Sequence, residues 1–283
     1  MRNAPPSSTS DIVQAVDWEM LCELAARGAV RDRAFVDAMI RMAFSRSSDD
    51  GEQRRLEALH EELRRAARAS HAELRAAIAN GSLRGTVLRK TFERVPFEER
   101  DHFVEEVLGI AYPPLDETAV EQDVMAYLPS GYGEIVHALD ATHLGAKDCL
   151  VDVGSGAGKV VMLAALLAGA SAEGIERDET LHDVAASAAE ELGLIGTRFI
   201  HGDARDASFD HADVVFMYLP FTGAVLDTVL GRLASADRPS RARGPFLCAG
   251  ALDLASHPDL TIAGPSRSWL NVYARAARTE PRP

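Results

Sequence analysis

The segment LVDVGSGAGKVV, residues 150–161, constrains the fold most, because an apolar run meets three glycines and then a second apolar run. The first run fits a buried parallel strand, and residues 160–167 fit the helix that follows it. Gly154, Gly156 and Gly158 carry no side-chain bulk, so the backbone can approach a ligand beside helix N-terminal amides. This junction favours a site for a nucleotide-type cofactor.

The spacing of the glycines distinguishes between types of cofactor site. A dinucleotide fingerprint needs a third glycine where Lys159 stands, and a P-loop is excluded by Val153 and Val160. What remains is Asp152, two positions before G-x-G-x-G, and this arrangement resembles motif I of class I S-adenosylmethionine (SAM)-dependent methyltransferases. A tight strand-to-helix turn without any ligand would also select these glycines, and that alternative stays open.

Two acidic residues downstream extend the resemblance. Glu176 ends a short strand within residues 172–178, at 24 positions after Asp152, close to the roughly 20-residue offset of a ribose-binding acid. Asp203 follows a third strand, residues 198–201. The resemblance implies that Glu176 binds the SAM ribose and that Asp203 faces the adenine, although a solvated strand end and an ordinary turn explain the same residues.

The resemblance therefore implies SAM as the cofactor and a set of residues that border it. The implied cofactor-binding residues are Tyr132, Glu134, Asp152, Gly154, Ser155, Gly156, Gly158, Lys159, Glu176, Arg177, Asp203 and Ala204.

The order of the remaining segments completes an α/β pattern. We expect a fourth strand at residues 213–217 and a helix at 222–233. Three further strands are expected at 245–249, 260–263 and 269–274. The count fits the seven-stranded, Rossmann-like sheet of class I methyltransferases with helices on both faces, preceded by an all-α N-terminal domain.

A narrower resemblance lies just upstream of the glycines. Residues 130–136, SGYGEIV, resemble the Y-G-E segment of the non-SET histone-lysine methyltransferases and their small bacterial relatives. It implies that Tyr132, Gly133 and Glu134 border the SAM methionine moiety and the acceptor channel. Tyr218 and Leu219 stand where the histone enzymes have an asparagine pair, so their acceptor chemistry does not carry over intact. The candidates for orienting or deprotonating an acceptor are Glu134, Tyr132 and Tyr218, while a helix-capping turn and simple packing remain the alternatives.

The N-terminal part of the chain has a different sequence pattern, one that is typical of helices. We expect a flexible segment at residues 1–10, an all-α accessory domain at 11–115 and a SAM-binding domain at 116–283. Apolar residues at three-and-four spacing predict a long amphipathic helix through residues 56–78. Shorter helices are expected at residues 12–26, 33–44 and 97–108. The domain fits a lid over the acceptor site or, alternatively, a packing or dimerisation module through which a homodimer could form.

Composition limits the partners. The net charge is −13, and −11 of it lies in residues 116–283, which disfavours nucleic-acid acceptors. An acidic surface suits a cationic amine or a basic peptide, although solubility explains it equally well. The three cysteines form no C-x-x-C pair and the histidines no H-E-x-x-H motif, so we expect no metal. No apolar stretch predicts a membrane span or a signal core, so we expect a cytoplasmic protein.

These features predict an enzyme that moves a methyl group from SAM to a nitrogen acceptor, either a lysine of a protein or peptide or another amine. Two alternatives remain. One is a small-molecule O- or N-methyltransferase of biosynthetic metabolism, and the other is a non-catalytic binding or assembly module with the same fold.

Overall fold

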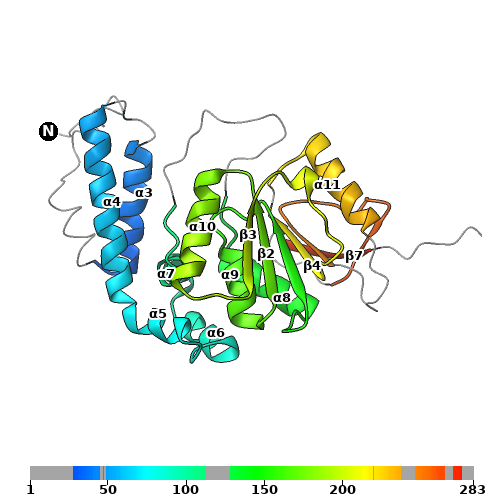
Figure 1. Cartoon of the computed structure of the whole chain (residues 1–283), viewed down its shortest axis with the longest axis horizontal. Helices are drawn as coiled ribbons and strands as arrows, with labels where there is room; N and C mark the ends of the chain where they lie inside the picture. The colour runs from blue at the N-terminus through cyan, green and yellow to red at the C-terminus, as the bar shows by residue number, and fades with distance from the viewer. Residues whose placement is uncertain are drawn as a thin grey trace, which may run out of the picture. The chain divides into compact units, whose positions relative to one another are not determined.

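The computed structural model describes residues 28–44, 47, 49–112, 128–218, 220–236, 246–264 and 270–275. The described residues form two compact units, residues 28–72 and residues 73–275 (Figure 1). The flexible segment expected at 1–10 and the helix expected at 12–26 lie outside the described residues. Residues 73–112, which the sequence assigned to a helical accessory domain, belong to the unit that contains the sheet.

The first unit is built on two helices, α3 (Val30–Phe44) and α4 (Asp50–Ser70), drawn in blue in Figure 1. Asp49 caps α4, because its side chain accepts a hydrogen bond from the Glu52 amide at 2.8 Å. Between the two helices lie five buried apolar side chains: Val36, Ile40, Leu56, Leu59 and Leu63. The predicted long helix ends at Ser70, and His71 leaves helical geometry before the next helix begins.

The second unit contains a seven-stranded sheet in the order β3-β2-β1-β4-β5-β7-β6, which confirms the predicted fold class. All neighbouring pairs from β3 to β5 are parallel, and β7 runs antiparallel to both β5 and β6. The strands are β1 (Cys149–Val153), β2 (Ser171–Glu176), β3 (Thr197–His201), β4 (Val214–Tyr218), β5 (Phe246–Gly250), β6 (Leu260–Ile262) and β7 (Leu270–Arg275).

Helices cover both faces of this sheet, as the alternation of side chains along β1 requires. Leu150 faces a core shared with α8 (Tyr132–Thr142), α9 (Lys159–Leu163) and α10 (Glu179–Glu191). Val151 and Val153 face the opposite core, which α11 (Gly223–Ser235) closes. The helix after the glycines is α-helical only to Leu163 and continues as a π-helical turn, η1 (Ala164–Ala168).

Three further helices pack on the same side of the sheet as α8 and α9. They are α5 (Ala72–Ala79), α6 (Gly85–Glu93) and α7 (Phe97–Leu108). Ile78, Phe92 and Val107 are fully buried in the core that also contains Leu150. Helix α7 therefore reaches the glycine segment, and this contact positions the acidic side chains described below. Within the described part of the chain, no helix is long and apolar enough to cross a membrane.

Candidate active site

The glycine segment turns tightly at the carboxyl end of β1. Gly154 and Gly158 have φ angles of +74° and +81°, in the left-handed region that favours glycine. A Cβ on Gly158 would lie 2.7 Å from the Phe199 ring, and a Cβ on Gly154 would lie 2.5 Å from Pro220. The turn therefore requires glycine at both positions, for its conformation and for its close packing.

Glu176 ends β2 beside this turn. The Gly156 amide donates a hydrogen bond to Glu176 Oε2 at 2.7 Å, and the Asp178 amide donates to Oε1 at 2.8 Å. Burial raises the pKa of Glu176, and the two amide hydrogen bonds oppose that rise. The carboxylate predicted to bind a ribose is thus held in a fixed position at the sheet edge where ligands of parallel sheets bind.

Two polar residues of the same segment are buried. Asp152 is 3% exposed, and burial, with the charge of Glu176, raises its pKa well above the ordinary value. The Ser155 hydroxyl has no hydrogen-bond partner among the described residues. It packs against Gly174, where a Cβ would lie only 2.6 Å from Ser155 Oγ. The buried Asp152 lies beside the turn, and the unpartnered Ser155 hydroxyl lies within it. These two polar groups favour a turn that binds a polar ligand over a turn that is purely structural.

Asp203 and its neighbours follow β3. The Asp203 side chain caps a short 3₁₀ turn, η2 (Ala204–Asp206), and forms an ion pair with Arg205 at 2.6 Å. The hydrogen bond from Arg205 lowers the pKa of Asp203. Arg177 is exposed at the end of β2, and its carbonyl oxygen lies 3.0 Å from His201 Nε2. The contacts of Asp203, Ala204 and Arg177 with a cofactor remain predictions.

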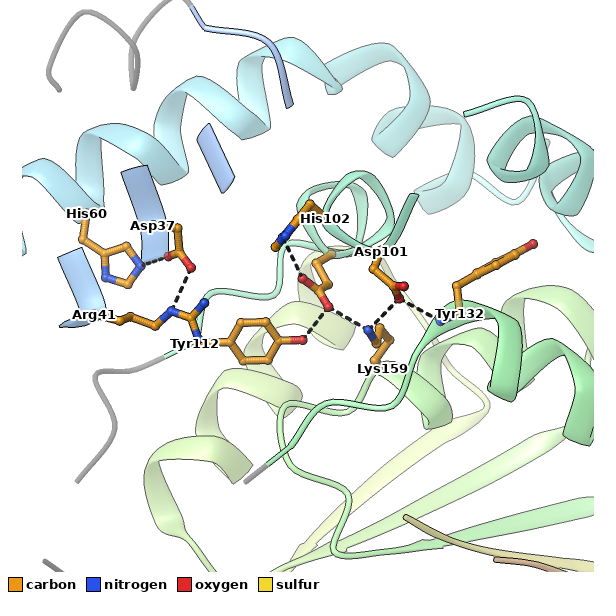
Figure 2. A network of polar contacts seen from close by, with 9 residues as sticks. Asp37, Arg41, His60, Asp101, His102, Tyr112, Tyr132 and Lys159 are labelled. Atoms are coloured by element: carbon orange, nitrogen blue, oxygen red, sulfur yellow. Dashed lines mark hydrogen bonds and ion pairs between the residues drawn. The ribbon is translucent and has the colours of Figure 1, made fainter. Parts of the chain in front are cut away.

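A second group of charges meets the glycine segment from α7 (Figure 2). Lys159, the first residue of α9, is buried, and its ammonium lies 2.7 Å from Glu105 Oε1 and 3.1 Å from Asp101 Oδ1. Burial alone would lower the pKa of Lys159, but the charges of Glu105 and Asp101 raise it. The lysine is therefore held as a cation between two carboxylates.

Glu105 is the most heavily bonded of these carboxylates. Besides the Lys159 ammonium, it accepts a hydrogen bond from the Tyr112 hydroxyl at 2.8 Å, and His102 Nδ1 lies at 3.6 Å (Figure 2). Burial would raise the pKa of Glu105, but the Lys159 charge and the hydrogen bonds lower it to about 2. Glu105 is thus a buried anion at neutral pH.

Tyr132 is the first residue of α8, and its backbone and its side chain make separate contacts. The Tyr132 amide donates a hydrogen bond to Asp101 Oδ1 at 2.7 Å. The ring is buried, edge-on to Phe92 with 5.9 Å between centroids, and the Arg100 guanidinium lies 5.8 Å from its centroid. Burial raises the pKa of Tyr132 to about 12. The phenol therefore packs in the core, and its catalytic role stays a prediction.

Glu134 and Tyr218, the other two predicted catalytic residues, lie near Asp101. The Glu134 carboxylate folds back against Gly131, and Asp101 Oδ2 flanks the same glycine. At the end of β4 the Tyr218 ring lies over Gly250, where a Cβ would collide with it. Burial, then the negative charges of Glu134 and Asp101, raises the pKa of Tyr218. The structure thus gathers two carboxylates and a phenol next to the glycine segment.

Asp101 and Glu105 are site residues that the sequence analysis missed. They stand four positions apart and so share one face of α7, a spacing that is visible in the sequence. Their partner Lys159 lies 58 and 54 residues further along the chain, and only the tertiary fold reveals that pairing.

Comparison with known proteins gives one family match. Residues 123–220, about a third of the chain, match the family model described as histone methylation protein DOT1. That segment contains the Y-G-E residues at the start of α8 and, at the carboxyl ends of β1, β2 and β3, the glycine turn, Glu176 and Asp203. The chain is a class I SAM-dependent methyltransferase. None of the curated proteins matches it.

The methyltransferase also resembles solved structures at low identity. An RNA methyltransferase from Salinibacter ruber in complex with S-adenosyl-L-homocysteine is 23% identical, with a TM-score of 0.45, over 55% of this chain and 98% of that chain. A SAM-dependent methyltransferase from Thiobacillus denitrificans, in complex with the same compound, is 26% identical, with a TM-score of 0.36, over 44% of this chain and 49% of that one. Likenesses at these TM-scores transfer no acceptor to this methyltransferase.

The residues present fit SAM as the cofactor. The glycine turn removes side-chain bulk, Glu176 presents a fixed carboxylate beside it, and the Ser155 hydroxyl is buried without a partner among the described residues. Glu176 would bind the ribose hydroxyls of SAM, and the glycine turn would contact its methionine portion. When bound, SAM supplies an electrophilic methyl group on a sulfonium.

Proposed function

We propose that this methyltransferase acts on the nitrogen of a cationic amine, such as a lysine side chain of a peptide or protein. The observation that carries the proposal is the group of Glu134, Asp101 and Tyr218 beside the glycine turn. Asp101 is already paired with the Lys159 ammonium, so the Glu134 carboxylate is the group that attracts a cation. An ammonium is the cation that yields a methyl acceptor on losing a proton.

The chemistry assigns a task to each of these residues. The amine must lose a proton before its lone pair attacks, and the Glu134 carboxylate accepts that proton, because Asp101 is engaged with Lys159 and the Tyr132 amide. The nitrogen–carbon bond then forms as the sulfur–carbon bond breaks. Positioning of the amine against the methyl group supplies most of the rate enhancement. Tyr218 stays protonated at neutral pH because burial raises its pKa, so it orients the acceptor by hydrogen bonding and does not act as a base.

Two findings support a protein or peptide lysine as the acceptor. The matching family model is described by histone methylation, and the Y-G-E residues lie within the matched segment. The charge of −11 in residues 116–283 favours a basic partner over a nucleic acid. Tyr218 stands where the histone enzymes have asparagine, so we do not extend the proposal to a particular histone site.

A methyl-transfer screen tests the proposal. The protein is incubated with isotopically labelled SAM and, separately, with lysine-rich peptides, small primary amines, catechols and a short RNA, and mass spectrometry locates the methyl group. We expect transfer to amine nitrogen, decreased about tenfold or more in Glu134→Gln. The matched control is Glu98→Gln, the same change at an exposed position of α7, which should leave the rate unchanged. Transfer to oxygen or to RNA instead would refute the amine proposal while leaving the methyltransferase assignment intact.

A further inference from the structure

We infer that Lys159 is a positioning residue, which fixes the glycine turn against α7 and the start of α8 and so keeps the turn ready for SAM. The inference rests on the methyltransferase assignment and is independent of the nature of the acceptor. It concerns a side chain that the sequence analysis placed among the residues bordering the cofactor.

The position of Lys159 gives it control of the turn. It directly follows Gly158, the last glycine of the motif, and it is the first residue of α9. Its side chain points to α7, where Glu105 and Asp101 accept from the ammonium at 2.7 and 3.1 Å (Figure 2). The two contacts of this ammonium therefore restrain the end of the glycine turn against α7.

Asp101 carries the connection to α8. Its Oδ1 atom accepts hydrogen bonds from both the Lys159 ammonium and the Tyr132 amide, at 3.1 and 2.7 Å (Figure 2). One carboxylate oxygen thus joins the first residue of α9 to the first residue of α8. Glu105 completes the network, because it accepts hydrogen bonds from both the Lys159 ammonium and the Tyr112 hydroxyl.

Stability alone is a weak reason for such an arrangement. Burying an ammonium and a carboxylate costs hydration energy, and replacing a buried ion pair by apolar side chains of similar volume is often neutral or stabilising. What an apolar pair does not reproduce is the directed bonding of one ammonium to two carboxylates. A stabilising role and a positioning role therefore predict different results when both members of the ion pair are replaced by apolar residues.

The test is the double variant Lys159→Met/Glu105→Met in the full chain, with thermal unfolding and calorimetric titration with SAM in the absence of any acceptor. We expect a Tm within about 5 °C of the wild-type value but a Kd for SAM raised about tenfold or more. The control is Arg89→Met/Asp140→Met, which removes an exposed ion pair between α6 and α8 and should leave the Kd unchanged.

A double variant that is folded and binds SAM with the wild-type Kd would overturn the inference. If it does not fold, Asp101→Asn decides, because that side chain is 43% exposed and tolerates the change. We expect Asp101→Asn to keep the wild-type Tm and to raise the Kd for SAM several-fold, whereas an unchanged Kd would again overturn the inference. Because no acceptor is present, failure of the amine proposal affects none of these results.

Discussion

The ammonium of Lys159 lies 2.7 Å from the carboxylate of Glu105, although 54 residues separate them along the chain. Both side chains are at least nine-tenths buried, so each charge depends on the other for compensation. The pair joins α7 to α9, the helix that follows the glycine turn.

The single variant Lys159→Met should therefore destabilise the protein strongly. It leaves the Glu105 carboxylate buried with no ammonium beside it, and breaking a buried pair in this way costs about 3–5 kcal/mol. Denaturant unfolding monitored by circular dichroism measures the loss. Adding Glu105→Met should recover most of it, and a single variant as stable as the wild type would show that Glu105 does not depend on Lys159.

Acid should unfold the protein partly through Glu105. Its pKa in the folded state is about 2, below its ordinary value of 4.5, so the folded state binds the proton more weakly than the unfolded state does. The stabilisation is complete above about pH 4.5 and is lost as the pH falls towards 2. Unfolding free energies measured between pH 6 and 3 should fall less steeply in Glu105→Gln than in the wild type. Parallel curves would contradict the prediction.

Gly158→Ala should impair folding. The residue has a φ of +81°, and an added Cβ would lie 2.7 Å from Phe199 and 2.8 Å from Ala185. The left-handed backbone and the overpacking together should cost about 2–4 kcal/mol of unfolding free energy. Gly133→Ala is the matched control, because nothing lies within 4 Å of its added Cβ, and it should change stability by less than about 1 kcal/mol.

Cys248 should resist thiol reagents in the native protein. It is fully buried in β5, and burial raises the pKa of its thiol to about 12, so almost no thiolate exists at neutral pH. Alkylation followed by peptide mass spectrometry should label it only after unfolding, while the half-buried Cys149 should react sooner. Rapid native labelling of Cys248 would mean that the sheet opens there.

Much of the sheet could be predicted from the sequence, because local patterns specify it. Apolar runs of strand length, separated by helical segments, gave the seven strands, and the structure places all seven in one sheet. The glycine turn was equally predictable, since Gly154 and Gly158 adopt positive φ angles that other residues rarely adopt. The end of α7 at Leu108 also matches, because Gly109 takes the left-handed C-cap conformation.

The remainder depends on tertiary contacts. Helix α6 was not expected, because its short sequence has only two buried residues, Leu88 and Phe92, and gives little periodic signal. The break at His71 was hidden, because the apolar spacing continues from α4 into α5 although the two helices belong to different units. Sequence alone does not distinguish Asp101 and Glu105 from ordinary surface charges of a helix. Only the fold shows that they meet Lys159.

The most direct test of the central claim is a calorimetric titration of the folded protein with SAM and with S-adenosylhomocysteine, with NAD as the control ligand and Glu176→Ala as the control variant. The account predicts micromolar binding of both adenosyl compounds, no binding of NAD, and a Kd raised about tenfold or more in Glu176→Ala, which loses the carboxylate beside Gly156. A protein that is folded yet binds neither adenosyl compound would contradict the assignment of this site to SAM.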